Sequence, residues 1–155
     1  MPQEDYFKRE IDKLGKFLAK ALSDLRHLKS VGKVQEGIDK VNKTFETELD
    51  ISVDSLLDLP VNEFLDLLIN SKKISTLRME YIADILSEIA DNLENTKALT
   101  AYKKALTLYK YIVDNESDYY IGRHYKIERI SSVIKNNSLI IAGIQIIYTF
   151  GYYTI

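Results

Sequence analysis

Apolar residues recur every three or four positions along most of the chain, and the clearest example lies between residues 75 and 115. Its first part places one apolar stripe on a helix: Leu77, Tyr81, Ile82, Ile85, Leu86 and Ile89. Its second part has the same period: Leu99, Tyr102, Leu106, Tyr109 and Ile112, beside Ala98, Ala101 and Ala105. Residues 91–96 between them are rich in helix-capping and turn-forming types. Because so short a connection keeps its two helices side by side, the pattern predicts an antiparallel helical hairpin.

The flanking stretches predict further helices. One is expected from about residue 3 to 28, ended by Ser30-Val31-Gly32, and a second over about 33–49. Residues 50–60 are expected to make one or two helical turns, and Pro60 begins a helix that runs to about 69. A charged helix is expected over about 118–134. The chain is therefore predicted to be all-α, built from antiparallel helical hairpins with about six helices.

Composition supports this fold class and narrows the function. The chain has 155 residues, enough for one domain, and only 6 Gly and 2 Pro, too few for an all-β protein with many tight turns. Its 21 basic and 23 acidic residues form no basic tract, so the charge pattern that nucleic-acid binding requires is missing. The absence of cysteine excludes disulfides and thiol chemistry. The polar, acidic N-terminus is unlike a secretory signal, and a cytoplasmic location is expected.

The last twenty residues differ from the rest. Residues 136–155 contain no charged residue, which divides the chain into a helical-hairpin domain, 1–135, and an apolar C-terminal segment, 136–155. A helix is expected over 138–150, buried against the N-terminal helix or a second copy, because a soluble monomer rarely exposes more than about 300–600 Å² of apolar patch. Two alternatives remain. Residues 138–155 could be a membrane anchor, since a helix of this length spans about 27 Å, or the product of an extended reading frame in AT-rich DNA.

Part of the central hairpin resembles a known repeat. Ala98, Tyr102 and Ala105-Leu106 match the second helix of a tetratricopeptide repeat (TPR), in which small residues admit a neighbouring helix and an aromatic ring fills the gap. More broadly, residues 56–60, 64–73 and 123–130 resemble an uncharacterised bacterial family of short all-helical proteins, a domain of unknown function. This likeness covers about residues 4–134. It implies an all-helical, TPR-like fold and carries no catalytic residues across.

The sequence contains no motif that would assign chemistry. A Gly-rich phosphate loop, a serine nucleophile motif, a paired-histidine motif and a zinc pattern are all missing. His27 lies three residues after Asp24, which is half of a metal-binding pair, but helical metal centres draw on several such pairs. No catalytic, cofactor-binding or metal-ligating residue is therefore assigned, no cofactor is expected, and the chain is not expected to be an enzyme.

The first hairpin helix carries an acidic stripe of Glu80, Asp84, Glu88 and Asp91. Such a stripe could dock a basic partner or a hard cation. The favoured interpretation is a solvated outer face that complements lysines on the next helix: Lys97, Lys103, Lys104 and Lys110.

Tyrosine is unusually frequent, with 11 in the chain, and many cluster where the hairpin joins the last charged helix. Tyrosine combines a large apolar ring with a polar tip and is common at binding surfaces. The candidate partner-binding residues are Tyr102, Tyr109, Tyr119, Tyr120 and Tyr125. These rings could equally pack the half-exposed end of the helical layer. The expected function is a non-enzymatic protein–protein interaction module whose partner is a protein, with self-association through the C-terminal segment open. The alternative is a membrane-tethered helical domain, and an enzyme without a recognisable motif ranks last.

Overall fold

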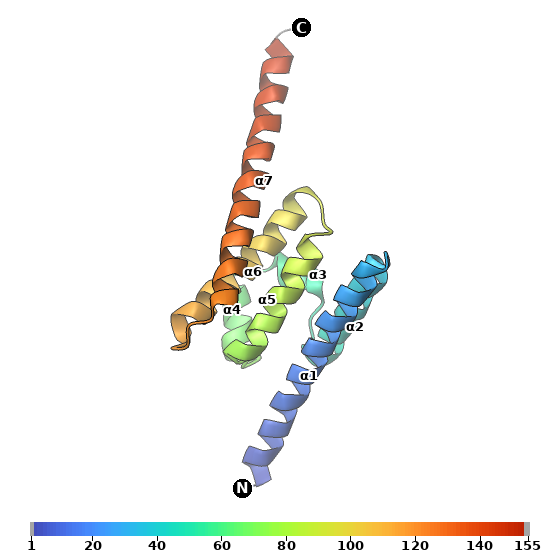
Figure 1. Cartoon of the computed structure of the whole chain (residues 1–155), viewed down its shortest axis with the longest axis vertical. Coiled ribbons are helices and arrows are strands. Elements are labelled where there is room, and N and C mark those ends of the chain that lie inside the picture. Colours follow the sequence, from blue (N-terminus) through green and yellow to red (C-terminus); the bar gives the residue numbers. More distant parts are fainter. Residues whose placement is uncertain (1, 154–155) are drawn as a thin grey trace.

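The computed structural model describes the backbone of residues 2–153, and their side chains except at 2, 7, 11–12, 139, 141–142 and 144–153. Every regular element in this range is a helix, as predicted (Figure 1). In chain order these are α1 (Pro2–Ser30), α2 (Val34–Glu48), α3 (Val53–Asp58), α4 (Val61–Asp66), the π-helical turn η1 (Leu67–Ser71), α5 (Thr76–Ala90), α6 (Asn95–Asn115) and α7 (Ile121–Tyr153).

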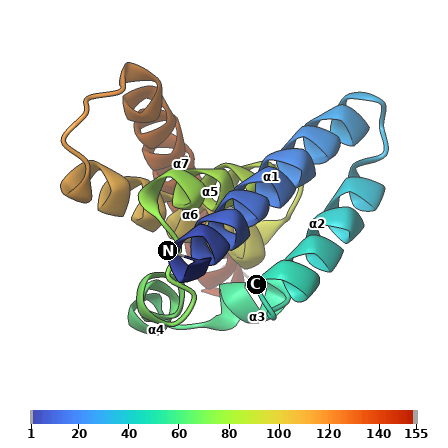
Figure 2. The same cartoon turned by 90° about the horizontal axis from the view of Figure 1, so that it is seen from below.

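Two long helical hairpins form the body of the molecule. Helix α1 packs on α2, and α5 packs on α6, so the hairpin predicted between residues 75 and 115 is confirmed. Helix α5 also contacts α1, while α7 packs on α6 (Figure 1). The short helices α3 and α4 carry the chain from one hairpin to the other and contact α6 (Figure 2). Helix α5 therefore lies at the centre, with α1 on one side and α6 and α7 on the other.

The core follows from this central position. Nine residues of α5 are buried: Met79, Ile82, Ala83, Asp84, Ile85, Leu86, Ser87, Ile89 and Ala90. On α6 the small residues Ala98, Ala101 and Ala105 are buried beside Tyr102 and Tyr109, which lets the two helices approach closely. Leu77 belongs to the apolar period of α5, yet it lies in the first turn and is 63% exposed. The buried face of α5 therefore begins at Met79.

The turn between α1 and α2 has a clear local cause. The amide groups of Gly32 and Lys33 donate hydrogen bonds to the carbonyls of Lys29 and Leu28, and Gly32 has a φ of +78°. Glycine adopts this left-handed conformation without steric cost, so it ends the helix. The predicted stop at Ser30-Val31-Gly32 is confirmed. After the turn, a Cβ on Gly37 would lie 3.0 Å from a methyl carbon of Leu25, which indicates how closely α2 packs on α1.

The C-terminal part differs from the prediction in one respect. The helices expected at about 118–134 and 138–150 form one continuous helix, α7, so the boundary between 135 and 136 falls inside it. The predicted boundary lies where the charged residues end, but the loss of charge does not interrupt a helix, and Asn136, Asn137 and Ser138 cost little in one compared with Gly or Pro.

The lower part of α7 packs on α6 and buries Ile130, while the remainder extends beyond the other helices (Figure 1). A helix over 138–150 is thus confirmed. The backbone of α1 lies toward the opposite end of the molecule from the end of α7. Of the two expected packing partners, the N-terminal helix of the same chain is therefore excluded, and packing against a second copy stays a prediction. The expected burial of Ile141 and Ile144 concerns side chains outside the described residues.

Candidate interaction surface

A sharp corner joins α6 to α7. The apolar period of α6 gives way to a polar stretch, 114–118, in which Glu116 takes an extended conformation and ends the helix. Asp and Ser in this stretch favour turns. The hydroxyl of Thr76, at the start of α5, donates a hydrogen bond to the carboxylate of Glu116. The corner is therefore attached to the central hairpin.

Exposed apolar side chains gather at this corner. Tyr119, Tyr120 and Tyr125 are 78%, 54% and 63% exposed, and Val113 and Ile121 are about half exposed. We call these five residues the aromatic corner. They make up five of the eleven large apolar side chains that are exposed in the described part of the chain, within thirteen consecutive positions. Apolar groups concentrated in this way mark interaction sites, and tyrosine is enriched where binding energy concentrates.

A small pocket lies within the aromatic corner. Its volume is about 200 Å³, and it is lined by Val113, Glu116, Ser117, Asp118, Tyr119, Tyr120, Arg123, His124 and Ile127. Small-molecule sites usually have volumes of roughly 300–1,000 Å³. The pocket is therefore better matched to a single side chain of a partner than to a complete metabolite.

Arg123 holds the pocket in shape. Its Nη2 lies 2.7 Å from a carboxylate oxygen of Glu80 on α5, and its guanidinium carbon lies 5.7 Å from the centre of the Tyr120 ring. An ion pair thus positions a cation–π contact with the ring. A Cβ on Gly122 would lie 2.6 Å from the same ring. Glycine at this position lets Tyr120 fold back over the first turn of α7.

The five predicted partner-binding tyrosines fall into two groups. Tyr119, Tyr120 and Tyr125 are exposed, whereas Tyr102 and Tyr109 are buried. The Tyr102 hydroxyl donates a hydrogen bond to Asp91, directly after α5, and the Tyr109 hydroxyl donates one to Asp84 on α5. Burial and the neighbouring carboxylates raise the pKa of both phenols far above the ordinary value. Tyr102 and Tyr109 therefore stabilise the hairpin from inside, and only the other three are available to a partner of the folded chain.

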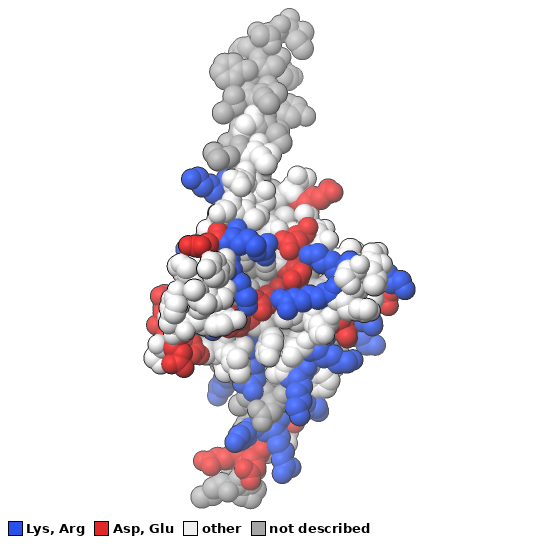
Figure 3. Space-filling view, viewed as in Figure 1, with Lys and Arg blue, Asp and Glu red and all other residues white. Residues whose placement is uncertain are grey.

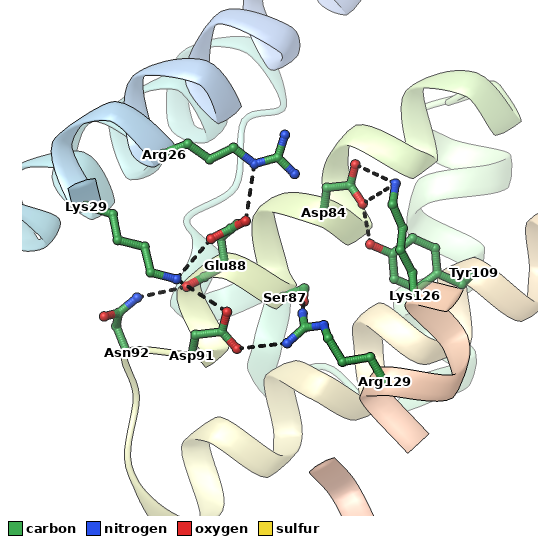
Figure 4. Close-up of polar contacts among 10 residues, drawn as sticks. All are labelled: Arg26, Lys29, Asp84, Ser87, Glu88, Asp91, Asn92, Tyr109, Lys126 and Arg129. Atoms are coloured by element: carbon green, nitrogen blue, oxygen red, sulfur yellow. Dashed lines mark hydrogen bonds and ion pairs between the residues drawn. The ribbon is translucent and has the colours of Figure 1, made fainter. Parts of the chain in front are cut away.

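The acidic stripe of α5 faces two neighbouring helices (Figure 4). On the α1 side, Glu88 accepts hydrogen bonds from Arg26 at 3.2 Å and Lys29 at 3.0 Å, and Lys29 also lies 3.3 Å from Asp91. Burial by itself lowers the pKa of Lys29, but the hydrogen bond and charge of Glu88 outweigh it and raise the pKa. These contacts attach α1 to the central helix.

On the α7 side, the cations recur every three residues. Lys126 lies 3.3 Å from Glu80 and 3.0 Å from Asp84. Arg129 donates a hydrogen bond of 2.7 Å to the hydroxyl of Ser87 and lies 3.6 Å from Asp91. Together with Arg123, they place three cations over the stripe. Figure 3 shows the acidic side chains in the middle of this face with basic side chains on either side.

The predicted partners of the acidic stripe were therefore wrong. The cations come from α1 and α7, because α6 faces α5 with alanines and two tyrosine hydroxyls. The lysines of α6 lie elsewhere: Lys97, Lys103 and Lys110 are exposed, and Lys104 is buried with its Nζ 5.4 Å from the centre of the Phe64 ring. The spacing of Arg123, Lys126 and Arg129 was the sequence signal that could have identified the true partners. Because cations of this chain already contact the stripe, it is a poor candidate for docking a basic partner.

Glu80 makes the stability of the α5–α7 contact depend on pH. Burial by itself raises the pKa of Glu80, but the hydrogen bond from Arg123 and the charge of Lys126 outweigh it and hold the pKa below 4.5. A lowered pKa in the folded state means that the contact stabilises the fold above the unfolded pKa and is lost as the pH falls through the folded pKa. We expect the wild-type chain to be more stable than Glu80→Gln at pH 7, and the difference to shrink as the pH falls below about 4.5. Urea unfolding at several pH values measures this difference, and a constant difference would contradict it.

Other candidate sites are weaker. His27 is exposed, and Asp24 lies 3.8 Å from Lys20. Within the described residues, no group of three or more His, Cys, Asp and Glu side chains is placed to hold a metal ion. A search of the same residues finds no helix with the length and apolar character needed to cross a membrane.

Comparison with protein-family models, with curated proteins and with solved structures finds no match to this chain.

Proposed function

We propose that the chain is a non-enzymatic protein-interaction module that binds a partner protein through the aromatic corner. The observation that carries this proposal is the exposure of Tyr119, Tyr120 and Tyr125 at one corner, where Tyr119 and Tyr120 line a pocket the size of one side chain. Interfaces draw most of their binding energy from a few aromatic or arginine anchors that fill such pockets. Exposed aromatic rings contribute little to folding stability, whereas their burial against a partner would be favourable.

The base of the corner is suited to this role. The first turns of α7 are attached to α5 by Arg123 and Lys126 and to the core by the buried Ile130. A surface that is already ordered loses less entropy when a partner binds. The resemblance of residues 98–106 to a TPR helix supports the same assignment, because helical-repeat scaffolds commonly present binding surfaces.

Photo-crosslinking tests the proposal. The photoreactive residue p-benzoylphenylalanine replaces Tyr119 in one variant and Val31, an exposed residue of the α1–α2 turn, in the control. We expect irradiated cells that carry the Tyr119 variant to give a discrete crosslinked band that the Val31 control does not give. The same pattern from both positions, or no band from Tyr119, would overturn the assignment of this surface.

A second candidate function is a membrane-tethered helical domain. The observation that favours it is the continuity of α7, which leads from a charged base directly into the uncharged residues 136–153 and beyond the other helices (Figure 1). A tethered chain would sediment with membranes and require detergent for release, and truncation after residue 135 would free it. A full-length chain that stays in the supernatant without detergent would exclude this candidate.

A further inference from the structure

We infer that the partner presents a basic segment to the aromatic corner and places one lysine or arginine side chain in the pocket. This inference rests on the proposed function and adds the chemistry of the partner. It follows from the charges that the chain leaves unpaired at the corner and from the apolar walls beside them.

The pocket carries two carboxylates, those of Glu116 and Asp118, and Asp114 is exposed less than one turn before Glu116. None of these three forms an ion pair with another described residue of the chain. Among the described residues, Glu116 accepts a side-chain hydrogen bond only from the hydroxyl of Thr76. Acidic side chains are visible in Figure 3 at the left edge of the body, where Figure 1 draws the connection between α6 and α7.

Two basic side chains at the start of α7 already have acidic partners on α5. Arg123 pairs with Glu80, and Lys126 pairs with Glu80 and Asp84. His124 lies 3.2 Å from Glu128, one turn further along α7. On α6, Lys110 is exposed one helical turn before Asp114, but no ion pair joins it to a described residue. The acidic stripe of α5 is thus matched by cations of the chain, whereas the acidic groups of the pocket are not, and a partner of opposite charge is favoured.

The remaining walls suit a long cationic side chain. Val113 and Ile127 are apolar, and Tyr119 and Tyr120 contribute aromatic rings. Lysine and arginine bury an apolar stem while their charged head reaches a polar or ionic partner. An aromatic ring also attracts a cation over its face. An acidic anchor would be repelled by Glu116 and Asp118. A purely apolar anchor would remove water from both carboxylates without replacing the lost hydrogen bonds.

The test measures binding of labelled synthetic peptides to the full chain by fluorescence anisotropy. The probe is a short peptide of alternating alanine and arginine, and its counterpart has glutamate in place of arginine. We expect the arginine peptide to bind, the glutamate peptide not to bind, and the Glu116→Gln/Asp118→Asn variant to bind the arginine peptide at least about tenfold more weakly. The matched control is Glu36→Gln/Glu46→Gln, which removes two exposed charges from α2 and is expected to bind as the wild type does.

Equal affinity of the two double variants would overturn the inference, because the arginine peptide would then bind by general charge alone. The crosslink from position 119 separates this failure from failure of the proposed function. A crosslinked band that persists when Glu116 and Asp118 are neutralised would leave the interaction surface in place and overturn only the basic partner. A band at twice the mass of the chain would identify a second copy as the occupant, and this result would also overturn the inference of a basic partner.

Discussion

A Leu86→Asp variant is expected to lose its cooperative folded state, whereas Leu77→Asp on the same helix is expected to keep it. Leu86 is fully buried on the central helix, and Leu77 is 63% exposed. An unpaired carboxylate in an apolar core costs several kcal/mol, which is comparable with the total stability of about 5–15 kcal/mol of a domain. Urea unfolding followed by circular dichroism measures both variants.

The two leucines belong to one apolar period, so the sequence pattern predicts burial of both. A difference between the variants would therefore support the burial that the structure assigns to each. Similar urea midpoints for the two variants would show that α5 is not the centre of the core. A folded Leu86→Asp chain with an unfolded Leu77→Asp chain would reverse the assignment of its buried face.

Truncating Asp84 is expected to have the second largest effect. Asp84→Ala removes the acceptor of the buried Tyr109 hydroxyl and one of the two carboxylates that contact Lys126. An unsatisfied buried hydroxyl and a broken ion pair together cost about 3 kcal/mol here, since Lys126 keeps Glu80 as a partner. Asp84→Asn, which keeps an acceptor oxygen, is expected to lose less.

The matched control is Glu128→Ala. Glu128 pairs with His124 one helical turn away, and its side chain is 62% exposed, so its loss is expected to cost about 0–1 kcal/mol. Urea midpoints at pH 7 rank the stability losses of Asp84→Ala, Asp84→Asn and Glu128→Ala. Equal losses for Asp84→Ala and Glu128→Ala would mean that the contacts of Asp84 with Tyr109 and Lys126 together contribute no more than a surface pair.

The sequence predicted the local elements well because their causes are local. The apolar period specified α5 and α6, and Gly32 specified the end of α1. Prediction from the sequence failed where the result depends on which helices become neighbours. Sequence proximity favoured lysines of the next helix as partners of the acidic side chains of α5. In the structure these side chains instead contact cations from α1 and α7, about 40–60 positions away.

The tyrosines illustrate the same limit at the candidate site. Tyr102 and Tyr109 follow the apolar period of α6, which is a signal for burial. Tyr119 and Tyr120 instead lie in the connection between α6 and α7. Composition alone treated all five as equivalent. The pocket could not be predicted, because it forms between the end of α6 and the first turns of α7 and depends on the angle between these helices.

The most direct test of the account is a calorimetric titration of the crosslinked partner, once purified, with a Tyr119→Ala/Tyr120→Ala/Tyr125→Ala variant of the full chain. These rings are largely exposed, so their removal is expected to change the melting temperature by no more than about 4 °C. Because two or more of them would act as anchors, affinity is expected to fall by at least about a hundredfold. An affinity equal to that of the wild type, in a variant that melts normally, would contradict the claim that the aromatic corner is a binding surface.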